Sequence, residues 1–143
     1  MLTSDFILSK CPKYSNISDI KKLNIWGEDI EDISVISQMT KLTVLSLSAN
    51  KISNLSPLAH CLNLRELYLR NNYINSFDEI SHLKNLPKLK ILWLEGNPIS
   101  DDPNYTQKVL KILPQISIFD NQSRLSIFGK VKISKKNQSE NKI

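Results

Sequence analysis

Residues 64–74 read Leu-Arg-Glu-Leu-Tyr-Leu-Arg-Asn-Asn-Tyr-Ile, and their pattern recurs along most of this 143-residue chain. Leu67 and Leu69 alternate with Tyr68 and Arg70, which is the spacing of a β-strand with one buried and one open face. Beyond residue 74 the apolar residues lie further apart, and this wider spacing predicts a helical turn after the strand.

Copies of the pattern begin at residues 20, 42, 64, 89 and 116, so successive copies lie 22, 22, 25 and 27 residues apart. The ninth position holds Glu28 in the first copy and asparagine in the next three: Asn50, Asn72 and Asn97. Leucines and asparagine at these positions, with a period of roughly 20–29 residues, resemble the consensus of leucine-rich-repeat proteins. Because one repeat cannot bury its apolar face alone, the copies are expected to stack.

Stacked copies predict an α/β leucine-rich-repeat solenoid, with parallel strands on its concave face and short helices or turns on its convex face. Residues 1–19 are expected to form an N-terminal cap over the open end of the core. Residues 20–122 hold the repeats and a C-terminal cap. Residues 123–143 are expected to be a basic, largely disordered tail, because the sequence from Ser134 onward is rich in Lys, Asn, Gln, Ser and Glu.

Three patterns predict where helices begin. Ser4 is expected to cap a short helix in the N-terminal segment. Ser76 and Glu79 have the spacing of a capping box, in which each side chain bonds to the other residue's backbone N–H. Asp102, followed by a proline, is expected to open the last helix.

The three repeated asparagines are expected to be structural. A side-chain amide at the point where the chain leaves a strand can accept from and donate to nearby backbone groups. Stacking would then place Asn50, Asn72 and Asn97 in a ladder. Losing one would leave buried backbone groups unpaired, at roughly 1–3 kcal/mol.

The positive charge of the chain belongs to its C-terminal end. Residues 1–120 carry 13 Lys plus Arg and 13 Asp plus Glu, whereas residues 121–143 carry six basic residues and Glu140. A nucleic-acid-binding body is expected to have a basic face, so the neutral balance of residues 1–120 argues against direct nucleic-acid binding. The basic tail is expected to be solvated, and binding to an acidic partner is the alternative.

The sequence gives no sign of catalysis or of a cofactor. It contains no Gly-rich phosphate loop and no Ser/His/Asp set. Cys61 is interpreted as a small buried hydrophobe, and His60 and His82 as surface residues, so no metal site is expected. The N-terminus lacks the features of a signal peptide and no apolar run is long enough to span a membrane, so a cytosolic protein is expected.

The last helical stretch, Tyr-x-x-x-Val-Leu-x-x-Leu-Pro at residues 105–114, makes the chain resemble the short cytosolic leucine-rich-repeat proteins. That class includes the spliceosomal A-prime protein, protein phosphatase regulators and the axonemal dynein light-chain regulator. Further stretches resemble the cilia- and flagella-associated leucine-rich-repeat family. They are Lys22-Leu-Asn-Ile-Trp-Gly27, Glu66-Leu-Tyr-Leu-Arg-Asn-Asn-Tyr-Ile74, Leu83-Lys-Asn-Leu-Pro-Lys-Leu89, Leu92-Trp-Leu-Glu-Gly-Asn-Pro98 and Asp120-Asn-Gln122.

This resemblance, which covers about residues 6–122, implies a location at a basal body, cilium or flagellum. It also implies protein partners, among them a NIMA-related kinase. Members of the family usually continue into a C-terminal helix that oligomerises. The sequence ends at residue 143 without such a helix, so a monomer is expected unless that helix is missing.

Strand residues between the buried leucines are expected to form columns on the concave face. Aromatic residues and arginine there are the usual anchors of protein interfaces. The partner-binding residues predicted from this register are Asn24, Trp26, Glu66, Tyr68, Arg70, Ile91, Trp93 and Glu95. The alternative is that Trp26 and Trp93 only pack on neighbouring strand side chains or beneath the terminal segments.

Two functions follow from these patterns. The first is a non-catalytic protein-interaction scaffold that uses its concave face at a cilium, flagellum or basal body. The second is a ribonucleoprotein adaptor, like the spliceosomal relative, which would hold the RNA-binding domain of another protein.

Overall fold

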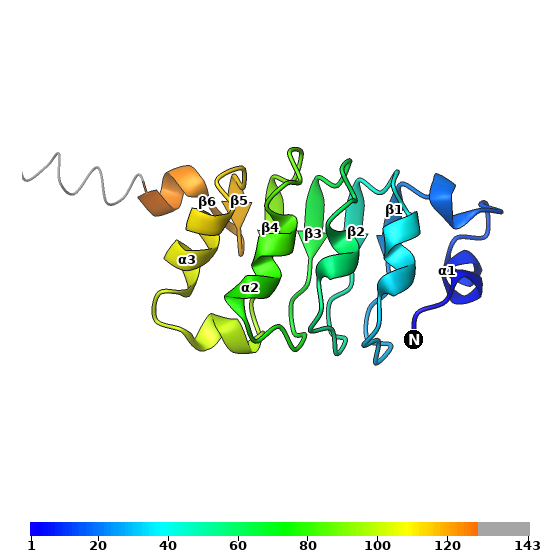
Figure 1. The fold of residues 1–143 in the computed structure, drawn as a ribbon, viewed down its shortest axis with the longest axis horizontal. Coiled ribbons are helices and arrows are strands. Elements are labelled where there is room, and N and C mark those ends of the chain that lie inside the picture. The colour runs from blue at the N-terminus through cyan, green and yellow to red at the C-terminus, as the bar shows by residue number, and fades with distance from the viewer. Residues whose placement is uncertain (129–143) are drawn as a thin grey trace, which may run out of the picture.

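The computed structural model, which describes residues 1–128, is a leucine-rich-repeat solenoid (Figure 1). Its sheet has the strand order β1-β2-β3-β4-β5-β6, so each strand pairs with the next one along the chain. The strands are β1 (Lys22–Asn24), β2 (Val44–Ser46), β3 (Glu66–Tyr68), β4 (Ile91–Trp93), β5 (Ile118–Phe119) and β6 (Gln122–Ser123). The first five are parallel, and β6 runs antiparallel to β5.

Short helical segments cover the side of the solenoid opposite the sheet, as expected (Figure 1). The α-helices are α1 (Ser4–Lys10), α2 (Phe77–Ile80) and α3 (Tyr105–Ile112). The 3-10 segments are η1 (Ile17–Asp19), η2 (Ser34–Gln38), η3 (Ser56–Leu58), η4 (Ser81–Leu83) and η5 (Pro98–Asp101). Residues 124–128 are also helical.

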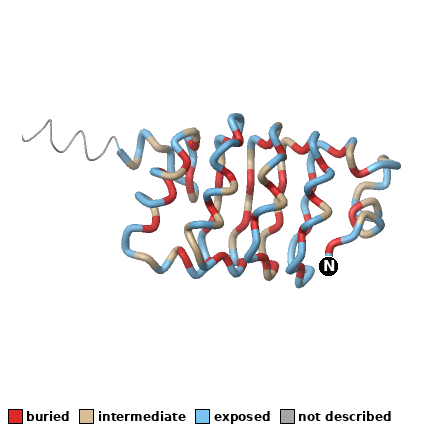
Figure 2. The backbone as a smooth tube through the Cα atoms, viewed as in Figure 1, coloured by how far each residue is buried: buried red, intermediate tan, exposed pale blue. Residues whose placement is uncertain are grey.

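The hydrophobic core runs along the whole solenoid between the strands and the helical segments (Figure 2). Leu45, Leu67 and Leu92 stand opposite one another in the strand register, and all are completely buried. Burying one such side chain contributes roughly 1.5–3 kcal/mol. The repeated leucines therefore set both the register of the strands and most of the stability.

The asparagine ladder forms as predicted. Asn50, Asn72 and Asn97 are 5%, 3% and 2% exposed. The Asn72 Oδ1 accepts from the backbone N–H of Ile52 at 3.0 Å, and its Nδ2 donates to the carbonyls of Leu47 and Leu69 at 3.0 and 3.1 Å. Each amide thus joins its own repeat to the preceding one, and we call these three residues the asparagine spine.

Two of the predicted helix starts are shifted. The N-cap of α1 is Thr3, whose Oγ1 accepts from the N–H of Phe6 at 3.2 Å, and Ser4 is the first helical residue. This register turns the completely buried Ile7 toward the core. Helix α3 begins at Tyr105, and Asp102 instead accepts from the N–H of Asn104 at 2.7 Å in the turn before it.

The predicted capping box at α2 forms only in part. The Ser76 hydroxyl accepts from the N–H of Asp78 at 3.2 Å. Glu79 does not bond back to Ser76, because its Oε2 accepts from the N–H of Leu55 on the preceding repeat at 2.8 Å. The carboxylate therefore joins two repeats instead of closing its own helix.

The C-terminal cap ends the parallel sheet at a sharp turn. Asp120 and Asn121 have φ angles of 48° and 68°, and the chain then reverses into β6. Arg124 donates to the carbonyls of Ile116 and Leu113 at 2.6 and 2.9 Å. The contacts of the cap thus extend to Arg124, and most of the tail expected at 123–143 lies outside the described residues.

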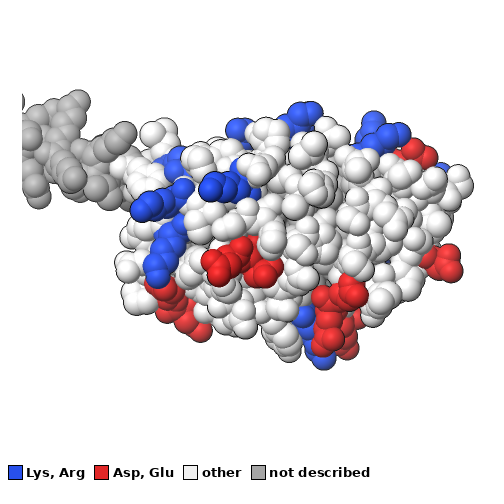
Figure 3. Space-filling view, viewed as in Figure 1, with Lys and Arg blue, Asp and Glu red and all other residues white. Residues whose placement is uncertain are grey.

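Most charged side chains along the two long edges of the solenoid are sorted by sign (Figure 3), with Asp19 beside Lys41 on the basic side and Lys51 beside Asp29 on the acidic side as exceptions. Basic residues gather at the edge where the strands begin: Lys21, Lys22, Lys41, Arg65, Lys88 and Lys90. Acidic residues gather toward the edge where the strands end: Glu28, Asp29, Glu31, Asp32, Glu95, Asp101 and Asp102. The neutral sum of the folded body therefore does not exclude a basic face, because stacking places charges according to their position in the repeat.

Candidate functional site

The strand register places the expected columns side by side. Asn24 pairs with Ser46, Ser46 with Tyr68, and Tyr68 with Trp93. A second column follows just beyond the strands, where the N–H of Asn71 donates to the carbonyl of Glu95 at 2.9 Å. The concave face is therefore an array of side chains whose neighbours come from different repeats.

Trp93 lies at the centre of an aromatic and cationic cluster. The Tyr68 ring meets it edge-on, with 5.6 Å between the ring centroids and 69° between the planes. The Arg70 Cζ lies 5.3 Å from the centroid of the Trp93 ring, which is within the range of a cation–π contact. We call Trp26, Tyr68, Arg70 and Trp93 the concave aromatic set.

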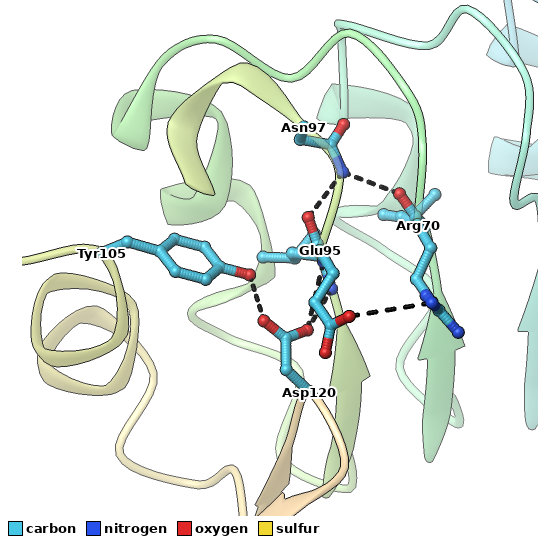
Figure 4. Close-up of polar contacts among 7 residues, drawn as sticks. Arg70, Glu95, Asn97, Tyr105 and Asp120 are labelled. Carbon is cyan, nitrogen blue, oxygen red and sulfur yellow. Dashed lines mark hydrogen bonds and ion pairs between the residues drawn. The ribbon is translucent and has the colours of Figure 1, made fainter. Parts of the chain in front are cut away.

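Acidic residues flank this set on both sides. The Tyr68 hydroxyl donates to Glu66 Oε1 at 2.5 Å. Burial raises the pKa of Tyr68 to about 12, and the Glu66 carboxylate adds to the shift. On the other side, Arg70 Nη2 lies 3.7 Å from Glu95 Oε2 (Figure 4). Tyr68 and Arg70 are therefore held in place over Trp93.

A hollow of about 400 Å³ opens at this cluster, and its lining includes the whole concave aromatic set with Asn24, Ser46, Ser48 and Asn71. The Trp26 side chain is 69% exposed, while Tyr68, Arg70 and Trp93 are half-buried. Within residues 1–128, Arg70 Nε and Trp93 Nε1 are shielded from water and have no hydrogen-bond partner. Buried donors without a partner are rare in native proteins.

The structure divides the predicted residues into groups. Asn24 and the concave aromatic set line the hollow. Glu95 does not line it but forms an ion pair with Arg70, which does. Glu66 and Ile91 line a separate hollow of about 450 Å³ toward the edge where the strands begin. The sequence reasoning missed Asn71, whose φ of 56° suits an asparagine and which follows Arg70 directly.

Asp120 is a second residue whose role the sequence did not indicate. Its Oδ1 accepts from the N–H of Leu94 at 2.6 Å, and its Oδ2 accepts from the hydroxyl of Tyr105 (Figure 4). Its carboxylate takes the place of the backbone carbonyl that a further repeat would supply. Burial raises the pKa of Asp120, while its hydrogen bonds to Tyr105 and Leu94 act in the opposite direction.

The described residues contain no group of three or more His, Cys, Asp or Glu placed to hold a metal ion. Cys61 is completely buried, and burial raises the pKa of its thiol to about 11. No helix within residues 1–128 has the length and apolar character needed to cross a membrane.

Comparison with known proteins links the chain to one repeat family. A sequence profile described as "Leucine-rich repeat" matches residues 14–143. The chain is 42% identical over 124 residues to the human cilia- and flagella-associated protein 410, an alignment that covers 85% of this chain and 48% of that protein. It is 43% identical over 119 residues to an uncharacterized protein of Caenorhabditis elegans, covering 82% of this chain and 25% of that protein.

The chain thus spans half or less of the length of these relatives. Among solved structures, a chain of the Drosophila melanogaster SNF/U2A′ complex matches with a TM-score of 0.58 and 22% identity. That match covers 86% of this chain and 84% of the other. At this identity the likeness shows the fold alone.

Proposed function

Because this chain belongs to the leucine-rich repeat family, we propose that it is a non-catalytic scaffold that binds a protein partner on its concave face. The observation that carries the proposal is the hollow at the concave aromatic set. Its lining includes the 69% exposed Trp26, which follows β1, and Trp93 of β4, whose ring is covered by Arg70. Tryptophan, tyrosine and arginine are the residues that most often dominate binding energy at protein interfaces.

Two features of the hollow favour a protein partner. Aromatic side chains each offer roughly 150–250 Å² for burial and lose little conformational freedom on binding. Arg70 Nε and Trp93 Nε1 are already removed from water. A partner carbonyl or carboxylate can reach them only if the side chains around them shift, and the new hydrogen bond would then satisfy donors that are unpaired in the free protein.

We place this binding at a cilium, flagellum or basal body, within the cytoplasm. The proposal rests on the 42% identity to a protein named as cilia- and flagella-associated. A NIMA-related kinase or an axonemal protein is the partner class that we propose for the concave face.

The test is to capture proteins from an extract of flagellated cells on the immobilised chain and to identify them by mass spectrometry. The double variant Tyr68→Ala with Trp93→Ala should reduce the capture of ciliary or kinase partners at least tenfold, since truncating one anchor of this kind typically costs about 2 kcal/mol or more. Urea unfolding of the variant should show that it is folded under the capture conditions.

The matched control is Tyr73→Ala with Leu62→Ala, because both side chains are more than half exposed and neither lines the hollow. This control should capture as the unmodified chain does. Equal capture by both double variants would disprove binding at the concave face. Capture of ribonucleoprotein proteins in place of ciliary ones would instead support the adaptor function, for which the fold match at 22% identity gives no specific support.

A further inference from the structure

The edge where the parallel strands begin brings basic residues from successive repeats side by side. The N–H of Thr43 donates to the carbonyl of Lys21 at 2.7 Å, and the N–H of Arg65 donates to that of Thr43 at 2.8 Å. The N–H of Lys90 continues the ladder to the carbonyl of Arg65 at 2.9 Å. The basic edge, as we name it, consists of Lys21, Lys22, Lys41, Arg65, Lys88 and Lys90.

Most of this charge has no ion-pair partner within residues 1–128. All of the basic-edge residues are exposed. Of these six residues, Lys41 alone forms an ion pair with a residue of 1–128, Asp19 at 2.9 Å, while Lys88 donates to the Asn63 side chain at 3.0 Å. Glu66 lies on the same edge, but its carboxylate accepts from Tyr68.

Two hollows lie along the basic edge, and both combine lysines with apolar surface. The larger, of about 530 Å³, is lined by Lys10, Cys11, Pro12, Lys13, Tyr14, Lys21 and Lys22. The smaller, of about 450 Å³, is lined by Arg65, Glu66, Pro87, Lys88, Lys90 and Ile91. The first hollow lies between residues 10–14 and β1, and the second lies between β3 and β4, so about three strand spacings separate them, or roughly 14 Å.

We propose that the basic edge binds an extended, acidic peptide segment of a protein partner, with apolar side chains of that segment in the two hollows. An extended chain advances roughly 3.3 Å per residue, so about four residues reach from one hollow to the other. Carboxylates next to those apolar side chains would lie over Lys21 at the first hollow and over Arg65 and Lys90 at the second. This surface is separate from the concave hollow, and the proposal stands without the function proposed above.

A peptide fits this edge better than a nucleic acid does. Single-stranded nucleic acids are held by aromatic side chains on which the bases stack. Of the aromatic residues in 1–128, the half-buried Tyr14 alone lines a hollow of this edge, whereas the most exposed ones, Trp26 and Tyr73, both follow the strands. The basic edge is also interrupted by Asp19 and Glu66, which repel a uniformly charged phosphate backbone but can face a neutral residue of a peptide.

The probe is a fluorescent peptide of about a dozen residues, made of Glu and Asp with Tyr or Leu at every third or fourth position. Fluorescence anisotropy with the full chain should show binding that weakens as salt rises. The triple variant Lys21→Gln, Arg65→Gln and Lys90→Gln should bind about tenfold more weakly, as expected for three exposed charge pairs. Its aromatic residues are untouched, so capture on the concave face should persist.

The matched control is Lys51→Gln, Lys108→Gln and Lys111→Gln. It removes the same number of positive charges away from the basic edge and keeps residues 129–143 unchanged. This control should bind the peptide as the unmodified chain does. Equal affinity of both triple variants would overturn the proposal, and so would edge-dependent binding of a single-stranded RNA of the same length, or of phosphatidylserine vesicles, without binding of the peptide.

Discussion

The asparagine spine and the concave aromatic set share the third and fourth repeats, yet they differ in how their polar groups are satisfied. Each spine amide lies inside the solenoid, and its nitrogen and oxygen are both hydrogen-bonded to backbone groups. The concave aromatic set keeps exposed surface and includes two donors without a partner. A polar group whose bonds are complete inside the fold stabilises it, whereas a buried donor without a partner adds no stability and can bond to another molecule once its neighbours move.

The largest effect that this comparison predicts is on stability, at the spine. Asn72→Ala removes the partner of the Ile52 N–H and of buried carbonyls, so the free energy of unfolding should fall by about 3 kcal/mol or more. Urea unfolding measures this change. Asn75→Ala, at an exposed position of the same repeat, is the control and should change stability by less than about 0.5 kcal/mol. Similar losses in both variants would mean that the spine is not what stabilises the fold.

The next effect concerns the turn that separates the two regions. Gly96 has a φ of 79°, and a Cβ there would lie 2.0 Å from the Oδ1 of Asn71, which lines the concave hollow. Gly96→Ala should therefore lower the free energy of unfolding by about 2 kcal/mol. Gly27 has a similar φ of 69° with nothing within 4 Å of its Cβ position, so Gly27→Ala should show the backbone strain alone, roughly 1 kcal/mol.

A second substitution separates the clash from the strain. Asn71→Gly in the Gly96→Ala background removes the side chain that the new methyl group would meet. The double variant should regain the steric part of the loss, which a double-mutant cycle measures. If Gly96→Ala and Gly27→Ala lower the free energy of unfolding equally, the side chain of Asn71 does not clash with a Cβ at residue 96.

The features predicted from sequence are those that the repeat itself determines. Period and leucine spacing predict which residues are buried, and the structure confirms Leu45, Leu67 and Leu92 in one core. The same register correctly places Tyr68 beside Trp93, because stacked repeats align equivalent positions. The binding role of the concave residues stays a prediction.

The features that could not be predicted depend on contacts between positions that are not equivalent in the repeats. Glu79 bonds to Leu55, and Tyr105 bonds to Asp120, and neither spacing follows from the period. The basic edge was missed for a different reason. A sum over residues 1–120 is zero, but stacking separates the charges by where each residue falls within its repeat.

Asp120 differs from both the spine amides and the unpaired donors of the concave aromatic set. Its side chain is hydrogen-bonded and partly buried, but it can carry a charge. Its pKa is raised by burial, so the folded state holds its proton more tightly than the unfolded chain does. Its contribution to stability is complete below the ordinary pKa of 3.8 and is lost as the pH rises through the raised value. The pKa values of Asp32 and Asp102 are lowered, so their contributions are lost only as the pH falls below 3.8.

Asp120→Asn should therefore become more stable relative to the unmodified chain as the pH rises from about 4 to 7. This change in relative stability should be smaller than the loss of unfolding free energy in Asn72→Ala. Urea midpoints across this pH range measure it. Tyr105→Phe removes a hydrogen bond that lowers the pKa of Asp120, so the pKa of Asp120 in the folded state should rise further. This variant should therefore become less stable relative to the unmodified chain as the pH rises. A pH dependence that is the same in both variants would show that this carboxylate is not coupled to folding.

The smallest expected effects distinguish the two tryptophans of the concave aromatic set. Trp93→Phe weakens the contact with Arg70 and should lower the free energy of unfolding by about 1 kcal/mol, whereas Trp26→Phe should change it by less than about 0.5 kcal/mol. Each variant leaves one tryptophan, so acrylamide quenching then reports on Trp26 or Trp93 separately. The remaining Trp26 should be quenched more strongly, because it is 69% exposed while Trp93 is half-buried. Equal quenching in both variants would mean that Trp26 packs against the strands and offers no open surface to a partner.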